Sequence, residues 1–457
     1  MMGSNEKEQI AKFENDKLAQ EYLEVLRKLI AKKSIFAQGI GLKEVANYLK
    51  DIFSQAGGEV LVDESYQAPL VLAKFKSPNP QAKTLIFYNH YDTVPADADQ
   101  VWTEDPFKLS LRDGYMYGRG VDDDKGHIIA RLTAVCQYMA EVGALPLNIT
   151  FMMEGAEESA STDLEEYLTK HREDLLPADF LIWEQGIKNA KGQLEITGGN
   201  KGIVTFDLSV KSASVDIHSK FGGVIESATW YLLRAIDSMR DDQGRILIDG
   251  IYDQVQKPTE RELELVEKYA IENGKGLTDL YGLELPVMLE DRQAFLKRYF
   301  FEPALGVEGI RSGYLGQGVK TIIPSTAQAK MEMRLVPGLT PAFVIDKIKR
   351  HLLKHGFDAV QVTYTLGEES YRSDMSAEPI LRVIDLAKRF YPAGLAVLPT
   401  AAGTGPMKMI HQALKVPMVA FGLGNANSRD HAGDENISIA DYYTHIELVK
   451  ELIKSYE

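Results

Sequence analysis

Several short apolar runs in this chain end in carboxylate or histidine side chains, an arrangement that a metal-dependent hydrolase requires. The apolar runs resemble buried strands in their length and in their β-branched and aromatic content. In an open α/β sheet, ligands collect beyond the carboxyl ends of the strands, so polar groups at these positions predict one shared site. The polar groups that follow these runs are His90 and Asp92, the acids 122–124, Glu157 and Glu158, Glu184, and His431.

His90 and Asp92 stand two residues apart at the end of the run 84–90, so their side chains are expected on the same face of a strand. A neutral imidazole is a good zinc ligand, and a neighbouring carboxylate commonly fixes its tautomer and orientation. Taken alone, a His-x-Asp sequence is more typical of a polar strand end that enters a loop.

Asp123 is the middle member of three adjacent acids, which lie between a Gly-Arg-Gly sequence and a Lys-Gly sequence. The flanking glycines indicate a backbone that bends to direct one carboxylate inward. A single carboxylate can bridge two divalent ions, which lie ~3.5–4 Å apart in hydrolases of this kind. Three adjacent acids on their own are ordinarily a solvated turn.

Glu157 and Glu158 follow the strand-like run 149–153, and adjacent carboxylates in such a turn point in different directions. One of them can bind metal while the other acts as a general base; the alternative is the acidic start of a helix. Glu184 and His431 are weak signals when each is considered alone, and a surface histidine is the simpler explanation for His431. All of these residues together are much harder to explain as surface groups.

Composition excludes several other classes of protein. The chain has 66 acidic and 51 basic residues and a net charge of −15, which argues against nucleic-acid binding. It has one cysteine, Cys136, in an apolar helical stretch, so a disulfide framework is impossible and a reducing compartment is expected. No apolar stretch approaches the ~20 residues of a membrane span, and the first residues do not resemble a secretory signal. A cytoplasmic protein is therefore expected.

The elements that must position these residues alternate between helix and strand. Helical patterns are predicted at 7–32, 42–56, 125–142 and 162–171, and strand-like runs at 59–63, 70–76, 84–90, 147–153 and 180–184. Such alternation predicts an α/β fold in which helices cover both faces of a mostly parallel sheet.

A different pattern begins near residue 198. It consists of strand-like runs and helical patterns in the order 202–211, 224–240, 328–336, 341–355 and 359–366, with a charged loop-and-helix stretch at 257–300. These features predict a smaller α+β domain of ordinary size. Because metal-type motifs lie on both sides of it, we expect an insertion: residues 202–369 form the smaller domain, and 1–201 and 370–457 form two parts of the catalytic domain.

With these residues assembled, the chain resembles the co-catalytic di-zinc amidohydrolases. That family includes carnosinase-like dipeptidases, glutamate carboxypeptidase G, aminoacylase and succinyl-diaminopimelate desuccinylase. The resemblance rests on the order and separation of several motifs, namely His-x-Asp at 90–92, Gly-Arg-Gly-x-x-Asp-x-Lys-Gly at 118–126, Glu-Gly-x-Glu-Glu at 154–158, and His431. Within the insertion, segments 214–219, 320–324 and 333–337 resemble that family's lid and dimerisation domain.

The resemblance implies two divalent metal ions, with zinc favoured and manganese or cobalt as alternatives. It implies that Asp123 bridges the ions, that His90 and Glu184 complete one site, and that Glu158 and His431 complete the other. It further implies that Asp92 supports His90. Glu157 would be the base that deprotonates the attacking water and then protonates the leaving amine.

The resemblance also implies how substrate is bound. His218 is similar to a histidine that reaches the partner subunit's site in a homodimer and stabilises the oxyanion. Arg334 is similar to an arginine that holds the substrate's carboxylate, for which a planar two-pronged donor is suited. Thr404 and Thr321 would assist in holding the substrate. If the chain is monomeric, His218 is simply a polar residue of the lid.

The sequence departs from the usual motifs at two places. Glu184 stands where many dipeptidases of the family carry aspartate and several carboxypeptidases carry glutamate, and the last motif reads His-Ala-Gly-Asp-Glu where His-(Ser/Ala)-Pro-Asn-Glu is usual. The expected activity is a metallo-exopeptidase, most specifically a dipeptidase. An N-acyl-amino-acid deacylase or carboxypeptidase is the alternative enzyme, and a non-catalytic metal-binding scaffold is the alternative of another class.

Overall fold

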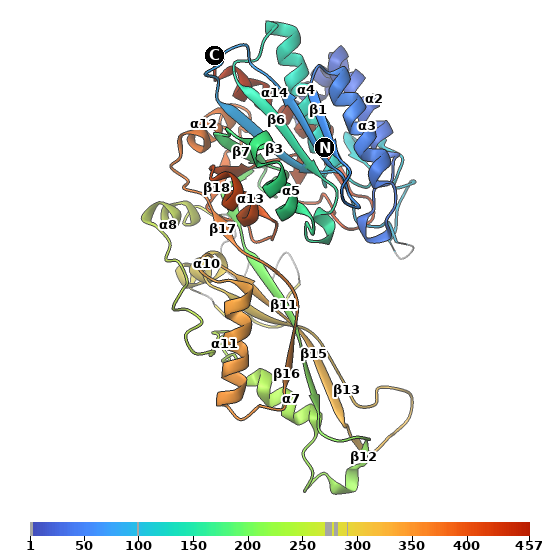
Figure 1. Ribbon diagram of the computed structural model, residues 1–457, viewed down its shortest axis with the longest axis vertical. Helices are drawn as coiled ribbons and strands as arrows, with labels where there is room; N and C mark the ends of the chain where they lie inside the picture. Colours follow the sequence, from blue (N-terminus) through green and yellow to red (C-terminus); the bar gives the residue numbers. More distant parts are fainter. Residues whose placement is uncertain (1–2, 98–99, 270–276, 278–281, 290) are drawn as a thin grey trace. The chain divides into compact units, whose positions relative to one another are not determined.

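The chain divides into two compact units in a computed structural model that describes residues 3–97, 100–269, 277, 282–289 and 291–457 (Figure 1). Unit 1 consists of Met1–Gly199, Ser373–Pro399 and Met409–Glu457, and unit 2 of Asn200–Arg372 and Thr400–Lys408. The chain thus leaves unit 1, forms most of unit 2, and returns.

The short segment Thr400–Lys408 groups with unit 2, although the sequence analysis placed it in the second part of the catalytic domain. Two long-range hydrogen bonds tie it there. The main-chain N–H of Lys201 donates to the carbonyl of Gly403 at 2.9 Å, and the side-chain amide of Asn200 donates to the carbonyl of Gly405 at 2.7 Å. Residues so far apart in the sequence leave no local pattern, so the grouping of this segment with unit 2 could not be predicted from the sequence.

Unit 1 contains a mixed sheet whose central strands β6, β3, β7 and β19 are parallel. Strands β1 and β2 extend one side in antiparallel fashion. The strand order is β1-β2-β6-β3-β7-β19-β9-β8-β20, with β18 paired to β9. The strands are β1 (Glu59–Asp63), β2 (Leu70–Phe75), β3 (Thr84–His90), β6 (Asn148–Glu154), β7 (Phe180–Trp183), β8 (Ile187–Lys188), β9 (Leu194–Thr197), β18 (Leu395–Leu398), β19 (Met418–Ala420) and β20 (Gly424–Asn425).

The mostly parallel character of the centre agrees with the α/β prediction. Every residue of β3 and β7 is buried, as expected for strands that are covered on both faces. A smaller sheet completes the unit: β4 (Ser110–Arg112) and β5 (Tyr115–Tyr117) join β21 (Asn436–Ser438). A separate two-stranded pairing joins β10 (Gly199–Asn200) to β17 (Tyr371–Arg372).

Helix α4 (Lys125–Val142) has the bounds that the sequence predicted and packs against β3, α2 and α14. It is buried on nearly every side, because other helices cover the side that faces away from the sheet. The remaining helices of unit 1 are α1 (Ser4–Asn15), α2 (Lys17–Ile30), α3 (Leu42–Gln55), α5 (Leu164–Lys170), α6 (Arg172–Leu175), α12 (Glu378–Ala387), α13 (Met407–Leu414) and α14 (Ile439–Lys454), with short 3₁₀ turns η1 (Phe36–Gln38) and η2 (Glu157–Ser159).

The single helix predicted at 7–32 is wrong, because the chain forms α1 and α2 with a break at Asp16. Asp16 has an extended backbone, and its carboxylate accepts a hydrogen bond of 3.0 Å from the main-chain N–H of Ala19. Aspartate is a favourable N-terminal cap, so it starts a second helix.

Unit 2 is built on the antiparallel sheet β13-β15-β11-β16, whose strands run side by side in Figure 1. Val204, Phe206 and Leu208 of β11 point to the buried face, which packs against α7 and α11. The elements are β11 (Gly202–Lys211), β12 (Ile217–His218), η3 (Ser219–Phe221), α7 (Ala228–Asp237), α8 (Glu260–Val266), α10 (Arg292–Phe301), β13 (Ala304–Ser312), β14 (Ile322–Ile323), β15 (Thr326–Leu335), α11 (Pro341–Lys354) and β16 (Gln361–Glu368).

In the described part of the chain, no helix has the length and apolar character that crossing a membrane demands.

Candidate active site

His90 is the last residue of β3 and is completely buried. Its Nδ1 lies 3.1 Å from the main-chain carbonyl of Asp92 and 3.3 Å from that residue's carboxylate. These contacts leave Nε2 directed at other acids. Burial opposes protonation, but the carboxylates of Asp123 and Asp92 hold the pKa of His90 well above its ordinary value.

Asp123 lies between two imidazoles. Its Oδ1 is 2.9 Å from Nε2 of His90, and its Oδ2 is 3.0 Å from Nε2 of His431. Burial works against ionisation, yet hydrogen bonds from both histidines hold the pKa of Asp123 well below its usual range. One carboxylate therefore serves both halves of the cluster, which is the geometry expected of a ligand shared by two cations.

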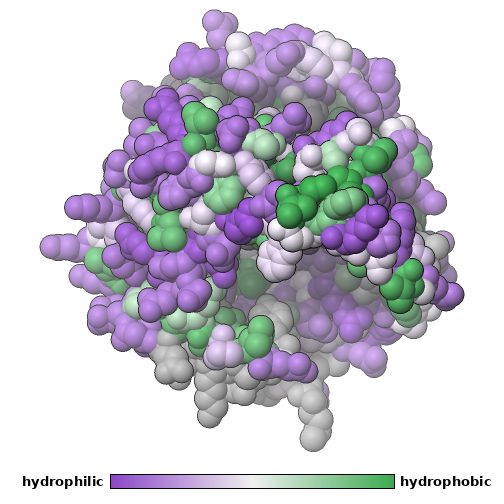
Figure 2. All heavy atoms as spheres, turned by 90° about the horizontal axis from the view of Figure 1, so that it is seen from below, coloured by the Kyte–Doolittle hydropathy of each residue, from purple (hydrophilic) through white to green (hydrophobic). Residues whose placement is uncertain are grey.

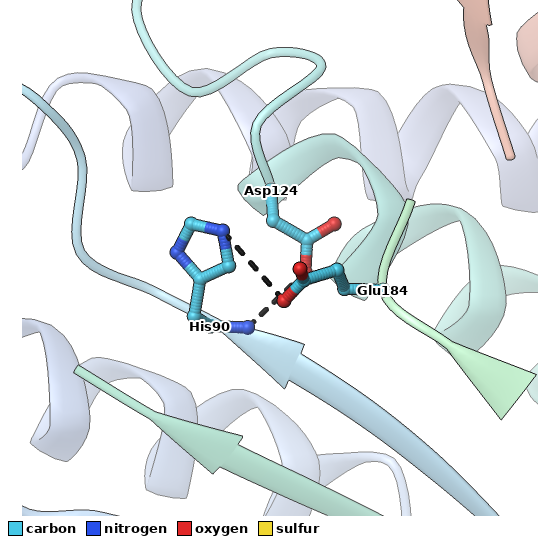
Figure 3. A group of neighbouring side chains, drawn as sticks. All are labelled: His90, Asp124 and Glu184. Carbon is cyan, nitrogen blue, oxygen red and sulfur yellow. Dashed lines mark hydrogen bonds and ion pairs between the residues drawn. The ribbon is translucent and has the colours of Figure 1, made fainter. Parts of the chain in front are cut away.

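Glu184 follows β7 directly, and its carboxylate lies 3.9 Å from Nε2 of His90. Figure 3 shows that His90, Glu184 and Asp124 converge, and their potential ligand atoms lie within 4.8 Å of one another. Asp124 has other partners: its Oδ2 accepts from the side-chain amide of Asn89 at 2.6 Å and from the main-chain N–H of His90 at 3.1 Å. Asp124 thus fixes the end of β3, a role that the sequence analysis missed.

Glu158 and His431 complete the second group together with Asp123, again with ligand atoms within 4.8 Å. Nε2 of His431 lies 3.1 Å from the carboxylate of Glu158. The His431 side chain is 56% exposed, so this half of the cluster is open to small molecules.

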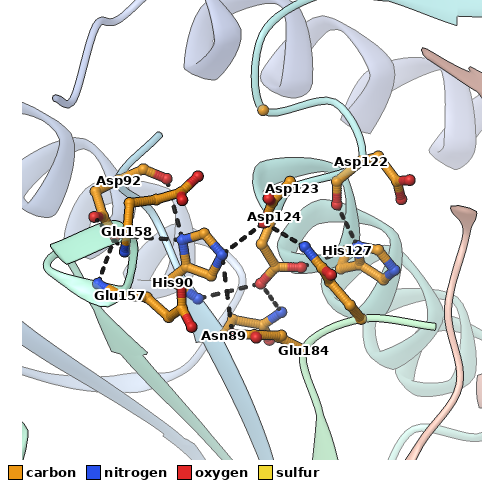
Figure 4. Close-up of polar contacts among 12 residues, drawn as sticks. Asn89, His90, Asp92, Asp122, Asp123, Asp124, His127, Glu157, Glu158 and Glu184 are labelled. Carbon is orange, nitrogen blue, oxygen red and sulfur yellow. Dashed lines mark hydrogen bonds and ion pairs between the residues drawn. The ribbon is translucent and has the colours of Figure 1, made fainter. Parts of the chain in front are cut away.

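Glu157 begins the turn η2 beside this cluster. Burial and the carboxylates of Asp123 and Glu158 raise the pKa of Glu157 well above its ordinary value, against the opposing effect of His90. Asp92 orients this turn, because its two carboxylate oxygens accept the main-chain N–H groups of Glu157 and Glu158, each at 3.2 Å. Figure 4 shows these groups arranged around His90.

The charges of the cluster fit divalent cations. Burial and the Glu157 carboxylate raise the pKa of Glu184 well above its usual range, and the buried Oε2 of Glu184 has no hydrogen-bond partner. Hydrogen bonds to Asp123 and Glu158 raise the pKa of His431 to about 10. The clustered acids therefore favour positive charge at this place, and carboxylate and imidazole donors together suit zinc, manganese or cobalt.

Glu435 is a second important acid that the sequence analysis did not select. It is completely buried and accepts from Nη1 of Arg119 at 2.6 Å. It also accepts from the main-chain N–H groups of Gly120, Asp122 and Asp123 at 2.9 to 3.1 Å. These bonds hold the bent backbone that directs Asp123 inward. Glu435 is the last residue of the His-Ala-Gly-Asp-Glu motif that begins at His431, so this motif was the signal that could have identified it.

Arg131 of α4 was also missed. Its guanidinium is buried and donates to the main-chain carbonyls of Tyr88, Trp183 and Glu184 and to the side chain of Asn89. It therefore joins the ends of β3 and β7, the strands that carry His90 and Glu184. An arginine inside an apolar helical pattern was the signal that could have been noticed.

The other predicted site residues belong to unit 2. Arg334 of β15 donates from Nη1 to the hydroxyl of Thr404 at 2.9 Å. His218 of β12 is exposed, and its Nδ1 accepts from the main-chain N–H of Lys220 at 3.1 Å. Thr321 is exposed, and its carbonyl accepts from the main-chain N–H of Ser219 at 3.1 Å. Arg334 and Thr404 are thus paired, while Thr321 lies beside the turn that follows His218.

Comparison with known proteins gives the same family from sequence and from structure. Residues 86–455 match the model of peptidase family M20/M25/M40. A Beta-Ala-His dipeptidase of Mus musculus is 29% identical over 387 residues, which cover 82% of this chain and 77% of that protein. A Cys-Gly metallodipeptidase of Schizosaccharomyces pombe is 31% identical over 292 residues, covering 63% of this chain and 60% of its own length.

Solved structures agree. An M20 family metallo-carboxypeptidase of Sulfolobus solfataricus is 34% identical with a TM-score of 0.85, and the alignment covers 95% of this chain and 99% of that one. Human carnosine dipeptidase 1 is 26% identical with a TM-score of 0.76, covering 98% and 99%. The match of most of the chain to the family model, together with the catalytic-type cluster in unit 1, shows that this protein is a metallo-exopeptidase that belongs to peptidase family M20/M25/M40.

Proposed function

We propose that this protein hydrolyses the peptide bond of dipeptides that carry a free carboxylate. We propose that it uses two divalent ions, of which zinc is favoured over manganese or cobalt. The observation that carries this proposal is the position of Asp123, whose two oxygens lie 2.9 and 3.0 Å from His90 and His431. The dipeptidases among the relatives support the choice of substrate.

His90 and Glu184 would hold one ion, Glu158 and His431 the other, and Asp123 both. Bound divalent ions supply electrostatic stabilisation of the polarised carbonyl and a lowered pKa for water. The chain's own part is to fix the ligands. Asp92 orients His90 through Nδ1 and orients Glu157 and Glu158 through their main-chain N–H groups.

Glu157 would act as general base and then as general acid. It takes one proton from the attacking water as the water oxygen bonds to the carbonyl carbon. It returns that proton to the nitrogen as the C–N bond breaks, so the products are an amine and a carboxylic acid, which releases its own proton to solvent at neutral pH. The raised pKa of Glu157 supports this assignment, because a carboxylate whose pKa is raised accepts a proton more readily.

Unit 2 would bind the rest of the substrate. Arg334, held by Thr404, would receive the substrate's carboxylate through its planar guanidinium, and Thr321 would assist. We propose a homodimer in which His218 stabilises the oxyanion in the partner subunit. Exposed apolar side chains on and beside α7 support a dimer surface; they are Val215, Phe221, Val224 and Trp230. Figure 2 shows one face of the molecule, where hydrophobic patches interrupt a mostly hydrophilic surface.

A second candidate reaction is removal of a C-terminal residue or an N-acyl group by the same residues. The similarity to the Sulfolobus metallo-carboxypeptidase favours this alternative. A non-catalytic metal scaffold is less well supported, because a structural metal does not require the half-buried base Glu157. We also propose a cytoplasmic location, which is consistent with the single buried cysteine Cys136.

The test is a screen of dipeptides, tripeptides and N-acyl amino acids with the metal-loaded protein and its Glu157→Gln variant. We expect the wild type to cleave dipeptides fastest, and the variant to bind about two divalent ions per chain yet lose activity by about a hundredfold or more. Glu165→Gln, on an exposed face of α5, is the matched control and should retain full activity. An active Glu157→Gln variant would remove the assigned base.

A further inference from the structure

His431 lies in the loop between β20 and β21, and its main chain is in the left-handed region, with a φ of 63°. Asp434 in the same loop has a φ of 60°. Residues other than glycine adopt this conformation at a cost in energy, so it persists only where neighbouring groups hold it. The His431 side chain is exposed, so burial does not hold it in place. The position of its imidazole therefore depends on the groups that bond to this loop.

The base of the loop is held by two side chains near its C-terminal end. The side-chain amide of Asn436 donates to the main-chain carbonyls of Asn427 and Asp434 at 2.9 and 3.0 Å. The buried carboxylate of Glu435 accepts from the main-chain N–H of Gly120 at 2.9 Å. These bonds fix the two sides of the loop where they come together.

The outer part of the loop contacts the segment 100–103, which we call the clasp. The side-chain amide of Gln100 donates to the main-chain carbonyl of His431 at 3.1 Å, across 331 residues of sequence. Oε1 of Gln100 accepts from Nη2 of Arg119 at 2.9 Å, and the ring of Trp102 lies 5.1 Å from the same guanidinium. Arg119 is itself buried and ion-paired. Gln100 thus joins the main chain of His431 to a group that is fixed in the core.

The other end of the clasp bonds to the carboxylate of Asp434. The main-chain N–H of Thr103 donates to Oδ1 at 2.9 Å, and the hydroxyl of Thr103 donates to Oδ2 at 2.7 Å. Nη2 of Arg112 in β4 lies 3.3 Å from Oδ2. Burial works against ionisation, yet the bonds from Thr103 and Arg112 lower the pKa of Asp434 below its ordinary value. A charged carboxylate therefore joins the loop to the clasp.

Gly433 allows the clasp to approach the loop closely. A Cβ atom at this position would lie 2.0 Å from the main-chain carbonyl oxygen of Val101, so no larger residue fits while the clasp is in place. Gly433 and Asp434 are also the two residues at which the last motif departs from the usual Pro-Asn. Both departures are thus residues that contact the clasp.

We propose that the clasp positions His431 for the second metal ion, with Gln100 and Asp434 as its positioning residues. It holds the main chain so that Nε2 of His431 lies 3.0 Å from Asp123 and 3.1 Å from Glu158. This proposal rests on the proposed function, because it takes His431 as a metal ligand.

The clasp should act on one ion and not on the other. Within the described part of the chain, its hydrogen bonds reach the His431 loop and Arg119, and none reaches His90 or Glu184. Loss of the clasp should therefore weaken the ion that His431 and Glu158 hold, and leave the ion that His90 and Glu184 hold nearly unchanged.

The first experiment needs neither metal nor substrate. Hydrogen exchange of the metal-free protein, followed by mass spectrometry, reports on peptides that cover residues 425–436. Gln100→Met and Asp434→Ala should each raise the exchange rate there by about tenfold or more, because the loop opens more often without the clasp. The control is Gln20→Met, because Gln20 is also partly buried and donates to a main-chain carbonyl, that of Phe13, at 2.8 Å. Exchange rates equal to the wild type in both clasp variants would overturn the proposal.

The second experiment titrates the metal-free protein with cobalt in a calorimeter. Gln100→Met and Asp434→Ala should each weaken one of the two ions by about tenfold and leave the other within about twofold. Asp434→Asn keeps an acceptor for the Thr103 N–H and should restore most of the lost affinity, whereas Gln20→Met should bind both ions as the wild type does. Equal weakening of both ions would indicate a general loss of structure and would overturn the positioning role, as would unchanged affinity for both.

The two proposals can fail separately. A wild-type protein that binds two cobalt ions and shows the expected effect of Gln100→Met, yet cleaves no dipeptide, would remove the proposed function and leave the clasp in place. A wild-type protein that binds a single cobalt ion would overturn the clasp together with the second metal site.

Discussion

Arg131 donates a hydrogen bond from Nη2 to the main-chain carbonyl of Glu184 at 2.8 Å. The same nitrogen donates to the carbonyl of Trp183 at 2.6 Å, so a buried cation of α4 fixes the residue at which β7 ends. Backbone carbonyls at strand ends in unit 1 thus depend on a side chain that touches none of the reacting groups.

Arg131→Met should weaken metal binding by ~10–100-fold, as loss of an outer-shell partner typically does. Methionine fills much of the volume but leaves the carbonyls of Tyr88, Trp183 and Glu184 without their donor. Competition with a fluorescent chelator measures the metal affinity. Arg350→Met, on an exposed part of α11, is the control, and equal metal affinities in the two variants would refute the positioning role.

Glu435→Gln should destabilise unit 1 by ~3–5 kcal/mol, because it leaves the buried guanidinium of Arg119 without its counter-charge. In the wild type, the Glu435 carboxylate accepts hydrogen bonds from the main-chain N–H groups of Gly120 and Asp122. The glutamine side chain would place its own N–H donors against some of these donors. Urea denaturation followed by circular dichroism measures the change. Glu165→Gln serves as the surface control, and a difference below about 0.5 kcal/mol between the two would contradict the assigned role.

We expect the ionisation of Asp63 to make a pH-dependent contribution to the free energy of unfolding. Burial opposes ionisation, but hydrogen bonds from His171, Lys170 and Ser65 hold the pKa of Asp63 well below its ordinary value. A depressed folded-state pKa means that the stabilisation is complete above the unfolded-state pKa of about 3.9 and is lost as the pH falls through the folded-state value.

Asp63→Asn should therefore lower the free energy of unfolding by about 1–3 kcal/mol at pH 6, and by progressively less below about pH 4. Urea denaturation of wild type and variant between pH 3 and pH 7 gives this difference directly. A difference that stays constant over the whole range would show that ionisation of Asp63 is not its source.

Removal of metal should abolish hydrolysis and lower the temperature of unfolding. Without cations, the acids Asp123, Glu158 and Glu184 remain close together and depend on His90 and His431 for charge balance. Ligand at a hundred times its Kd stabilises by about 2.7 kcal/mol, so differential scanning calorimetry should detect the loss. Re-addition of zinc, manganese or cobalt should restore both properties, and full activity after exhaustive chelation would argue against the proposed reaction.

The local sequence pattern was sufficient to predict the bounds of those helices and strands whose burial in the fold matches their apolar periodicity. Helix α4 and strand β11 have the predicted bounds, since apolar periodicity and flanking glycines mark them clearly. Strand β13 was missed, because most of its residues are exposed and its sequence Ala-Leu-Gly-Val-Glu-Gly has no amphipathic alternation. Its partner strand β15, rather than its own composition, makes it a strand.

The same distinction applies to the site. His90, Asp123 and His431 carry chemistry in their side chains and follow recognisable motifs. Asp124, Arg131 and Glu435 act chiefly through main-chain groups that are distant in sequence, such as the N–H of His90 or the carbonyl of Glu184. A hydrogen bond between a side chain and a remote backbone group has no sequence motif. The roles of these three residues are therefore identified only from the folded structure.

The position of β19 between β7 and β9 has a consequence for how the protein is made. Residues Met418–Ala420 leave the ribosome long after both neighbours, so a nascent chain holds two unpaired strand edges while the whole of Asn200–Arg372 is being translated. Open edges invite pairing with other chains. Slow translation or premature termination before β19 should therefore yield aggregates, whereas the intervening unit, whose antiparallel sheet comes from one continuous stretch, can fold first.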